Sequence, residues 1–517
     1  PSFTATSGVR QGCPLSPLLF ALVADVLLRR LHDKLPHCLT RAFADDTAMV
    51  MPNFAANADM VMAIFKDFAR ISNLRLNIDK TVMIPLWEST AEGVHRWLRS
   101  DFPQWAKIDV AWSACYLGVH VGPHRARKNW TKAIAKFQKT VEAWSSLSLG
   151  MSLNASIFRT FCSSVLSFLW QLDDVPEEVY KLEHWALRRL APGPGNWLRP
   201  AELHHMKSFG APFDFPSFRH MALAAKLRFM RFEPQLNWDG NYAQMLAIVR
   251  SLDGARSTWS SWYLASPILA LARATDIAAS LNVTAEVVCG TLRERLARQG
   301  LVNKLIKKRF QAEALCLLAA SDHYNAEDAL RHRLKRLRRW TTLVPDGVLA
   351  RRALRYVKAA FEQVPRRVAL VLLRSLFNGW CTARRFQVTG SSCLFHCSMR
   401  HSDLQEDSIE HYAHCPVVVD FARRTLHMSN DASGTTTSFL CLDRDTPEDV
   451  RILQLLLLYA VYSATNTLRH SCEPPSAQHV PSMLMQFVKQ GAQGSCSARG
   501  ALSAALNVQR AVRPRHQ

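Results

Sequence analysis

The stretch of sequence that decides the fold is Arg41-Ala42-Phe43-Ala44-Asp45-Asp46-Thr47-Ala48-Met49-Val50-Met51. Its two arms, 41–44 and 47–51, predict a β-hairpin with the turn at Asp45 and Asp46. Aspartate is common in turns for conformational reasons, so these residues alone fit an ordinary turn. They also fit a catalytic site, because phosphoryl transfer with two metal ions requires carboxylates held rigidly beside Mg²⁺. The hairpin by itself leaves both interpretations open.

The segments around the hairpin extend it into a mixed domain. Apolar residues at helical spacing predict a helix over residues 14–35 and a second helix over 55–71. Residues 76–84 and 116–121 are predicted strands. Helix, hairpin, helix and strands in this order predict an α+β domain over residues 1–122.

The remainder of the chain has an almost wholly helical pattern. Helices are predicted over 133–147, 156–172, 221–232, 292–318, 329–340 and 348–361. The Pro-Gly run at 191–195 is a predicted boundary, and the Ser-, Ala-, Gln- and Gly-rich end is predicted to be a flexible basic tail. The predicted divisions after the first domain are 123–190, 191–387, 388–420, 421–474 and 475–517.

Composition indicates a polyanionic partner. Lys and Arg number 64 against 42 Asp and Glu, a net charge of +22, and each cation placed on a phosphate releases counterions. No apolar run is long enough to span a membrane, and no secretory leader is recognisable. The 13 cysteines are mostly scattered singly, as in proteins of reducing compartments. We therefore expect an intracellular protein of the nucleus and cytoplasm; oligomeric state is left open.

Four segments resemble the ordered motifs of reverse transcriptases. Ser7-Gly8-Val9-Arg10-Gln11-Gly12-Cys13-Pro14-Leu15-Ser16-Pro17-Leu18-Leu19-Phe20 is similar to the family's Gly-rich loop and following helix, and 43–46 resembles its aromatic-Ala-Asp-Asp motif. Residues 72–81 are similar to the Gly-Leu-x-Leu-Asn-x-x-Lys-Thr segment, with Asn73 where Gly is usual. Residues 116–122 resemble the segment that grips the primer. The wording Gln-Gly-Cys-Pro-Leu-Ser-Pro indicates the non-LTR (LINE-type) branch of eukaryotic retrotransposons.

This resemblance implies a partial right-hand polymerase palm, followed by a mostly α-helical thumb and a C-terminal helical region. It implies Mg²⁺ on Asp45, with Asp46 as its partner and Lys80 near the leaving pyrophosphate, although Lys80 also fits an ordinary surface lysine. The implied ligands are an RNA template, a DNA primer or target, and dNTPs. Template and nucleotide contacts fall on Gly8, Arg10, Gln11, Gly12 and Pro14, and the primer grip on Tyr116, Leu117 and Gly118.

The family resemblance also implies a further essential aspartate ahead of the Gly-rich loop. Only six residues precede Ser7, and residues 1–6 contain no acid. We therefore expect an N-terminally truncated fragment that is inactive alone, whereas its full-length parent carries out two-metal nucleotidyl transfer. Primer extension by the 517-residue chain above an Asp45→Ala control would contradict this expectation.

Two basic helical segments are candidates for contact with the nucleic-acid backbone. Lys132, Lys136 and Lys139 recur about one turn apart at the start of the predicted thumb, where an ordinary solvated helix face is the alternative. Residues 331–339 are denser in charge and adjoin Trp340, which offers base stacking. A nuclear-import signal and an RNA-tethering surface fit this second segment equally well. Its candidate phosphate contacts are Arg336, Arg338 and Arg339.

A Cys/His cluster follows in the segment 388–420. Cys393-x3-Cys397 and His411-x3-Cys415 supply three thiolates and an imidazole, a donor set suited to structural Zn²⁺. Its second half resembles the zinc-knuckle-like motif that many non-LTR proteins carry after the polymerase. His396, His401 and His414 are alternative ligands, and free cysteines in a helical bundle remain an alternative to a metal site.

These observations predict an RNA-directed DNA polymerase fragment of a non-LTR retrotransposon. A rival from another class is a non-catalytic nucleic-acid-binding protein, either a relic or co-opted, that has kept the basic helices and the metal site. An organellar intron maturase shares the palm motifs, but the late Cys/His cluster counts against it.

Overall fold

The computed structural model describes residues 14–87, 89–123, 125–232, 244, 247, 267–299, 306–337, 347–388, 392–397, 406–429, 435–444, 446–471 and 479–512. Contacts divide the chain into two compact units. The first unit comprises Pro1–Ala133 with Asp239–Leu269, and the second comprises Ile134–Trp238 with Ala270–Gln517. The predicted site residues Gly8, Arg10, Gln11, Gly12, Arg338 and Arg339, and residues 513–517, lie outside the described residues. The prediction of a flexible tail over 475–517 is wrong for most of its length, because His479–Ala492 and Cys496–Val512 are helices.

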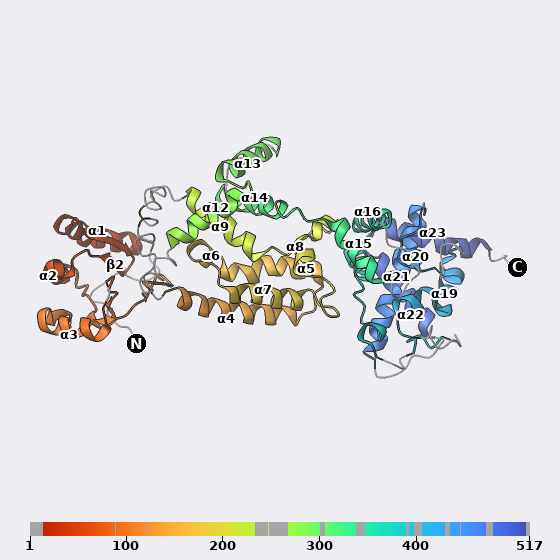
Figure 1. Ribbon diagram of the computed structural model, residues 1–517, viewed down its shortest axis with the longest axis horizontal. Helices are drawn as coiled ribbons and strands as arrows, with labels where there is room; N and C mark the ends of the chain where they lie inside the picture. Colours follow the sequence, from red (N-terminus) through yellow and green to blue (C-terminus); the bar gives the residue numbers. More distant parts are fainter. Residues whose placement is uncertain are drawn as a thin grey trace. The chain divides into compact units, whose positions relative to one another are not determined.

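The first unit combines three helices with three small sheets (Figure 1). Strands β1 and β2 pair antiparallel, β3 and β4 parallel, and β5 and β6 antiparallel. In chain order the elements are α1 (Ser16–Lys34), β1 (Leu39–Phe43), β2 (Asp46–Val50), α2 (Phe54–Ser72), the 3₁₀ turn η1 (Ile78–Lys80), β3 (Val82–Met83), α3 (Ala91–Asp101), the 3₁₀ turn η2 (Pro103–Trp105), β4 (Asp109–Val110), β5 (Ala114–Tyr116) and β6 (Val119–Val121).

One apolar core holds the helices of this unit together. Leu27 and Leu31 of α1 pack with Ala58, Val61 and other buried residues of α2, and the core continues to α3 and β4. Asn53 caps α2 through its side chain, and Asn73 ends that helix in the left-handed conformation (φ +58°). The position at which the family usually has Gly therefore adopts a left-handed conformation, which asparagine tolerates.

Three local predictions for this unit differ from the structure. The turn of the acidic hairpin lies one residue earlier than predicted, at Ala44 and Asp45. The predicted strand 76–84 is reduced to the two-residue strand β3, because the Asn77 side chain accepts a hydrogen bond from the backbone N–H of Lys80 and starts the 3₁₀ turn η1. The predicted strand 116–121 is the turn and second strand of the β5–β6 hairpin, since Leu117 and Gly118 both have positive φ.

The second unit is helical. Helix α4 (Arg125–Ser145) crosses the division between the units. The following elements are α5 (Met151–Ile157), the π-helical turn η3 (Phe158–Cys162), η4 (Ser163–Leu166), α6 (Leu169–Leu172), α7 (Glu177–Leu190), α8 (Pro200–His204), η5 (Met206–Phe209), α9 (Phe218–Phe232), α12 (Pro267–Ser280), α13 (Ala285–Gln299), α14 (Ile306–Ala320), α15 (Ala326–Leu337), α16 (Gly347–Gln363), α17 (Arg366–Leu376), η6 (Arg384–Phe386), α18 (Ile409–His414), α19 (Pro416–Leu426), α20 (Thr436–Phe439), α21 (Glu448–Arg469), α22 (His479–Ala492) and α23 (Cys496–Val512).

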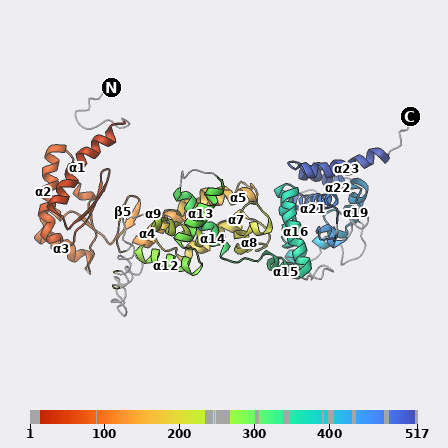
Figure 2. The same cartoon turned by 90° about the horizontal axis from the view of Figure 1, so that it is seen from above.

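Helix α21 contains a long apolar segment because other helices surround it. Its residues from Ile452 to Val461 are all buried, and α17, α22 and α23 pack around it. Figure 2 shows α22 and α23 beside it. A helix that is apolar on every side is expected inside a protein core. No helix in the described parts of the chain is long and apolar enough to cross a membrane.

The described residues are thus mostly helical, with small sheets confined to the first unit. At this level the predicted α+β class is confirmed.

Candidate functional site

The acidic hairpin presents Asp45 and Asp46 at its tip. Ala44 and Asp45 form the two-residue loop, and Asp46 is the first residue of β2, paired with Phe43 of β1. Ala44 has a φ of +50°, a conformation that reverses the chain tightly. Both aspartates are exposed. The reversal places the two carboxyl groups at one end of the hairpin, where a cation in solvent can approach both of them.

Lys80 lies in the turn η1, which is a separate element of the first unit. Its backbone N–H donates to the Asn77 side-chain oxygen at 3.2 Å, and its side chain is exposed. Pro14, just ahead of α1, is also exposed. The structure therefore places Pro14 and Lys80 at the surface, which a role in ligand binding requires.

The predicted primer grip is the turn of the β5–β6 hairpin. Leu117 and Gly118 have φ values of +51° and +82°, and Leu117 is 48% exposed. A leucine in the left-handed region is uncommon, and such backbone strain tends to occur at functional sites. The hydroxyl of Tyr116 donates to the carbonyl oxygen of Arg41 in β1 at 3.5 Å. This contact connects the turn to the acidic hairpin within the same unit.

Helix α4 carries the predicted backbone-contact lysines on one exposed face. Lys132, Lys136 and Lys139 are all exposed, and so is Lys128 one turn ahead. No acidic partner of these four lysines occurs among the residues that the structure describes. Burial and the ammonium groups of Lys128 and Lys132 lower the pKa of His120 in β6, so this end of α4 lies beside the β5–β6 hairpin.

The Cys/His cluster converges in the second unit. The Sγ atoms of Cys393 and Cys415 are 3.9 Å apart, and the Sγ of Cys397 is 3.4 Å from Nε2 of His411. All four donor atoms lie within 4.8 Å of one another. Tetrahedral zinc with Zn–S bonds of ~2.3 Å places two thiolates about 3.8 Å apart, so the donor set and its spacing fit this ion. The fold therefore brings the four predicted donors together as a group that could hold a metal ion.

The surroundings hold these donors in place. The backbone N–H of Phe395 donates to Sγ of Cys393 at 3.4 Å, and the hydroxyl of Ser408 caps α18 by accepting from the N–H of His411. A hydrogen bond with Cys415 and burial raise the pKa of the Cys393 thiol to about 12, so the thiolate form needs a cation beside it.

The alternative histidines are not part of the cluster in the described residues. Nε2 of His414 lies 3.2 Å from the hydroxyl of Thr436. His396 is exposed at a residue with positive φ, and His401 lies outside the described residues. His411 is therefore the histidine that the fold brings to the three cysteines.

Comparisons with known proteins identify the first unit. Residues 2–121 match the family described as reverse transcriptase (RNA-dependent DNA polymerase). The chain is also 39% identical over 84 residues to the Retrovirus-related Pol polyprotein from type-2 retrotransposable element R2DM of Drosophila melanogaster. Residues 2–121 are thus similar to reverse transcriptases, and the retrotransposon relative supports a non-LTR element. The match to the polyprotein covers 15% of this chain and 8% of that relative. The segment contains the acidic hairpin, Lys80 and the β5–β6 turn.

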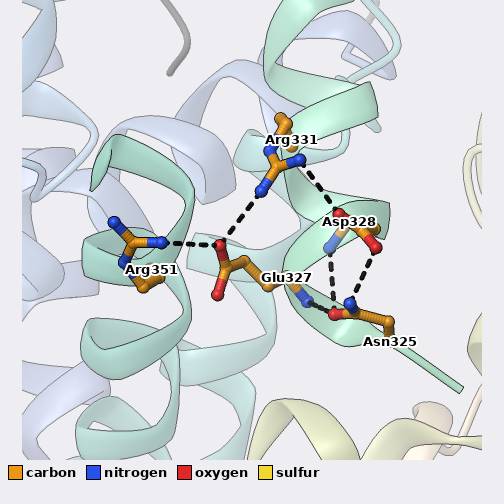
Figure 3. Close-up of polar contacts among 5 residues, drawn as sticks. All are labelled: Asn325, Glu327, Asp328, Arg331 and Arg351. Atoms are coloured by element: carbon orange, nitrogen blue, oxygen red, sulfur yellow. Dashed lines mark hydrogen bonds and ion pairs between the residues drawn. The ribbon is translucent and has the colours of Figure 1, made fainter. Parts of the chain in front are cut away.

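The basic run that follows this reverse transcriptase segment is, in part, structural. Figure 3 shows Arg331 of α15 between Glu327 and Asp328, 3.2 Å from each, while Arg351 of α16 reaches the same oxygen of Glu327 at 3.5 Å. Asn325 caps this helix through the N–H groups of Glu327 and Asp328. Arg331 is therefore paired within its own helix, and Glu327 joins α15 to α16 through Arg351.

Arg333 is a second structural arginine of the run. Its Nη2 lies 3.4 Å from Oε1 of Glu202 in α8, and both side chains are buried. Of the predicted phosphate contacts, Arg336 lies in α15, and its side chain is outside the described part. Spacing along the helix could not reveal the pair of Arg333 with Glu202, because Glu202 is 131 residues away in the sequence.

Asn129 of α4 is a site residue that sequence reasoning missed. It is 8% exposed, and its side chain bonds to the backbone of His120 in β6. Asparagine near the start of a helix is common, so no sequence signal distinguishes it.

Proposed function

We propose that this protein serves RNA-directed DNA synthesis for a non-LTR retrotransposon. The first unit would form part of a polymerase palm, and α4 with the following helices would form a thumb that cradles the primer–template duplex. The partners are then an RNA template, a DNA primer or nicked target, and dNTPs. This activity places the protein in the nucleus and cytoplasm.

One observation carries the proposal. The reverse transcriptase family match of residues 2–121 spans a hairpin whose tip bears two adjacent, exposed carboxyl groups. Oxygen donors on a rigid turn are the ligands that Mg²⁺ takes in phosphoryl-transfer sites. The donor set therefore fits the magnesium ions that such enzymes use.

The residues of the chain have distinct proposed roles. Asp45 and Asp46 hold the cation against the nucleotide phosphates, and bound Mg²⁺ would neutralise charge on the attacking and leaving oxygens. Lys80 supplies positive charge, and a donatable proton, to the leaving pyrophosphate. Tyr116, Leu117 and Gly118 hold the primer end, and the lysines of α4 bind phosphates without reading sequence.

The Cys/His cluster is proposed to hold structural Zn²⁺. Cys393, Cys397, His411 and Cys415 would complete a closed tetrahedral set, and the ion would fix the otherwise short elements around α18. We expect about one zinc per chain by metal analysis and a clear loss in Cys397→Ser. A Cys316→Ser variant, at an exposed cysteine of α14, is the matched control. Equal zinc content in both variants would contradict the assignment.

The magnesium site can be tested without relying on turnover. Fe²⁺ commonly substitutes for Mg²⁺, and with ascorbate and peroxide it cleaves the peptide backbone close to where it is bound. We expect cleavage of the full chain near residues 45 and 46, suppressed by excess Mg²⁺ and lost in Asp45→Asn. Cleavage that persists unchanged in Asp45→Asn would overturn the proposed metal site.

The same experiment separates the proposal from its main rival. A non-catalytic nucleic-acid-binding protein would retain hybrid binding, but it would not need a cation at Asp45. Primer extension on an RNA template then tests the reaction itself. Any extension must vanish in Asp45→Ala, and extension that survives this substitution would refute the assigned role.

A further inference from the structure

Asn129 links α4 to the β5–β6 hairpin through two hydrogen bonds. Its Oδ1 accepts from the backbone N–H of His120 at 2.7 Å, and its Nδ2 donates to the carbonyl oxygen of the same residue at 3.1 Å. The side chain is 8% exposed. An amide that occupies both backbone groups of one strand residue acts like an additional strand neighbour, and it fixes β6 relative to the helix.

The hairpin is also fixed on its other sides. Tyr116 reaches the carbonyl oxygen of Arg41, which lies in the strand that leads to the acidic tip. Gly122, directly after β6, has a φ of +110° and packs so closely that a Cβ atom there would lie 2.6 Å from the carbonyl oxygen of Trp112. The turn at Leu117 and Gly118 is therefore held between α4 and β1.

Cationic side chains accompany this link. Lys128 precedes Asn129 directly, and Lys132 lies one turn further along the same exposed face of α4. Both are close enough to His120 for their charges to act on its imidazole. Because Asn129 holds the helix to the strand, the two lysines and the turn residues keep constant separations.

We propose that Asn129 is a positioning residue for primer binding: its amide holds the turn at Leu117 and Gly118 and the lysines Lys128 and Lys132 in one rigid arrangement that receives the primer strand. Asn129 itself touches no substrate. The inference rests on the proposed function, since it assumes that these groups contact a primer–template duplex.

The test measures binding of the full 517-residue chain to a fluorescent RNA–DNA hybrid with a recessed 3′ end, and to single-stranded RNA of the same length. Asn129→Leu removes both hydrogen bonds at similar volume. We expect about a tenfold loss of hybrid affinity with little change for single-stranded RNA, a size typical of two lost hydrogen bonds at one site. Asn129→Asp keeps the acceptor alone and should show a smaller loss.

Gln454→Leu is the matched control for a general effect on folding. Gln454 of α21 is also a buried side-chain amide, 2% exposed, and its Nε2 donates to Oδ2 of Asp443 at 3.4 Å in the second unit. It should lower thermal stability without changing hybrid affinity. Thermal unfolding of every variant identifies any that fail to fold.

A double-mutant cycle separates positioning from simple stability. Lys132→Ala should weaken hybrid binding by about threefold in the wild-type background and much less in Asn129→Leu, because the lysine is no longer held in place. Additive effects, or wild-type affinity in both Asn129 variants, would overturn the inference while leaving the proposed function intact. If the wild-type chain shows no preference for the hybrid over single-stranded RNA, the proposed function fails as well.

Discussion

Replacing Arg333 by methionine should destabilise the second unit strongly. The Nη2 atom of Arg333 lies 3.4 Å from Oε1 of Glu202, and the two side chains are only 4% and 2% exposed. The guanidinium also lies 5.2 Å from the centroid of the Phe377 ring. Removing the cation leaves a buried carboxylate whose remaining partner is Arg199, through its Nε and backbone N–H.

The magnitude follows from this burial. Breaking one side of a buried ion pair costs about 3–5 kcal/mol, and we expect the lower end of this range because Arg199 still pairs with Glu202. Methionine nearly fills the volume, so a cavity contributes little. Arg331, two residues earlier in α15, is 39% exposed and pairs with Glu327 and Asp328 in contact with solvent. Arg331→Met should therefore cost only ~0–1 kcal/mol.

Urea denaturation of the full chain, followed by circular dichroism and tryptophan fluorescence, compares the two variants. A large fall in midpoint is expected for Arg333→Met and a small one for Arg331→Met. The double variant Arg333→Met with Glu202→Gln should regain part of the loss, since it leaves no buried unpaired charge. Equal effects of the two single variants, or strictly additive effects in the double variant, would refute this reasoning.

Two further predictions concern buried groups. Burial lowers the pKa of Lys226 from 10.5 to about 8, and its ammonium donates to the carbonyl oxygens of Trp170 and Asp173 at 2.8 Å each. Between these pH values the unfolded chain holds a proton that the folded chain lacks, so the free energy of unfolding should rise with pH. In Lys226→Met the urea midpoint should lack this rise between pH 8 and 10. The same rise in the variant as in the wild type would contradict the role of Lys226. Gly122→Ala should lower the free energy of unfolding by about 1–3 kcal/mol more than Gly118→Ala does. Its thermal midpoint should therefore be the lower of the two. Both residues have positive φ, but only at Gly122 would the new Cβ clash, so equal midpoints would contradict the geometry.

Local signals in the sequence were sufficient for the elements that carry the site. The arms around Asp45 and Asp46 form the predicted hairpin, and the helices on either side of it begin and end within two residues of their predicted bounds. The paired spacing of the Cys/His cluster was also sufficient to predict its four donors. Each pair lies on a short segment, so the fold only has to bring the two segments together.

The remaining features depend on backbone choices and distant partners. Leucine rarely adopts positive φ, so nothing marked Leu117 as a turn residue, and residues 116–121 looked like one strand. No residue near Arg333 in the sequence indicates Glu202, so an arginine of a buried ion pair looked like part of a basic run that contacts nucleic acid. The role of Asn129 likewise depends on a strand residue that only the fold brings beside it.

These long-range contacts decide which basic side chains of the protein remain available to bind nucleic acid. The sequence contains two basic helices, yet Arg331 and Arg333 of α15 are occupied by acidic partners, and the buried pair of Arg333 with Glu202 joins α15 to α8. The lysines of α4 are exposed, and within the described ranges they have no acidic partner. Counterion release requires cations that are free to meet phosphates. Helix α4 therefore has exposed charge that is available to a duplex, and it is the helix that Asn129 joins to the predicted primer grip.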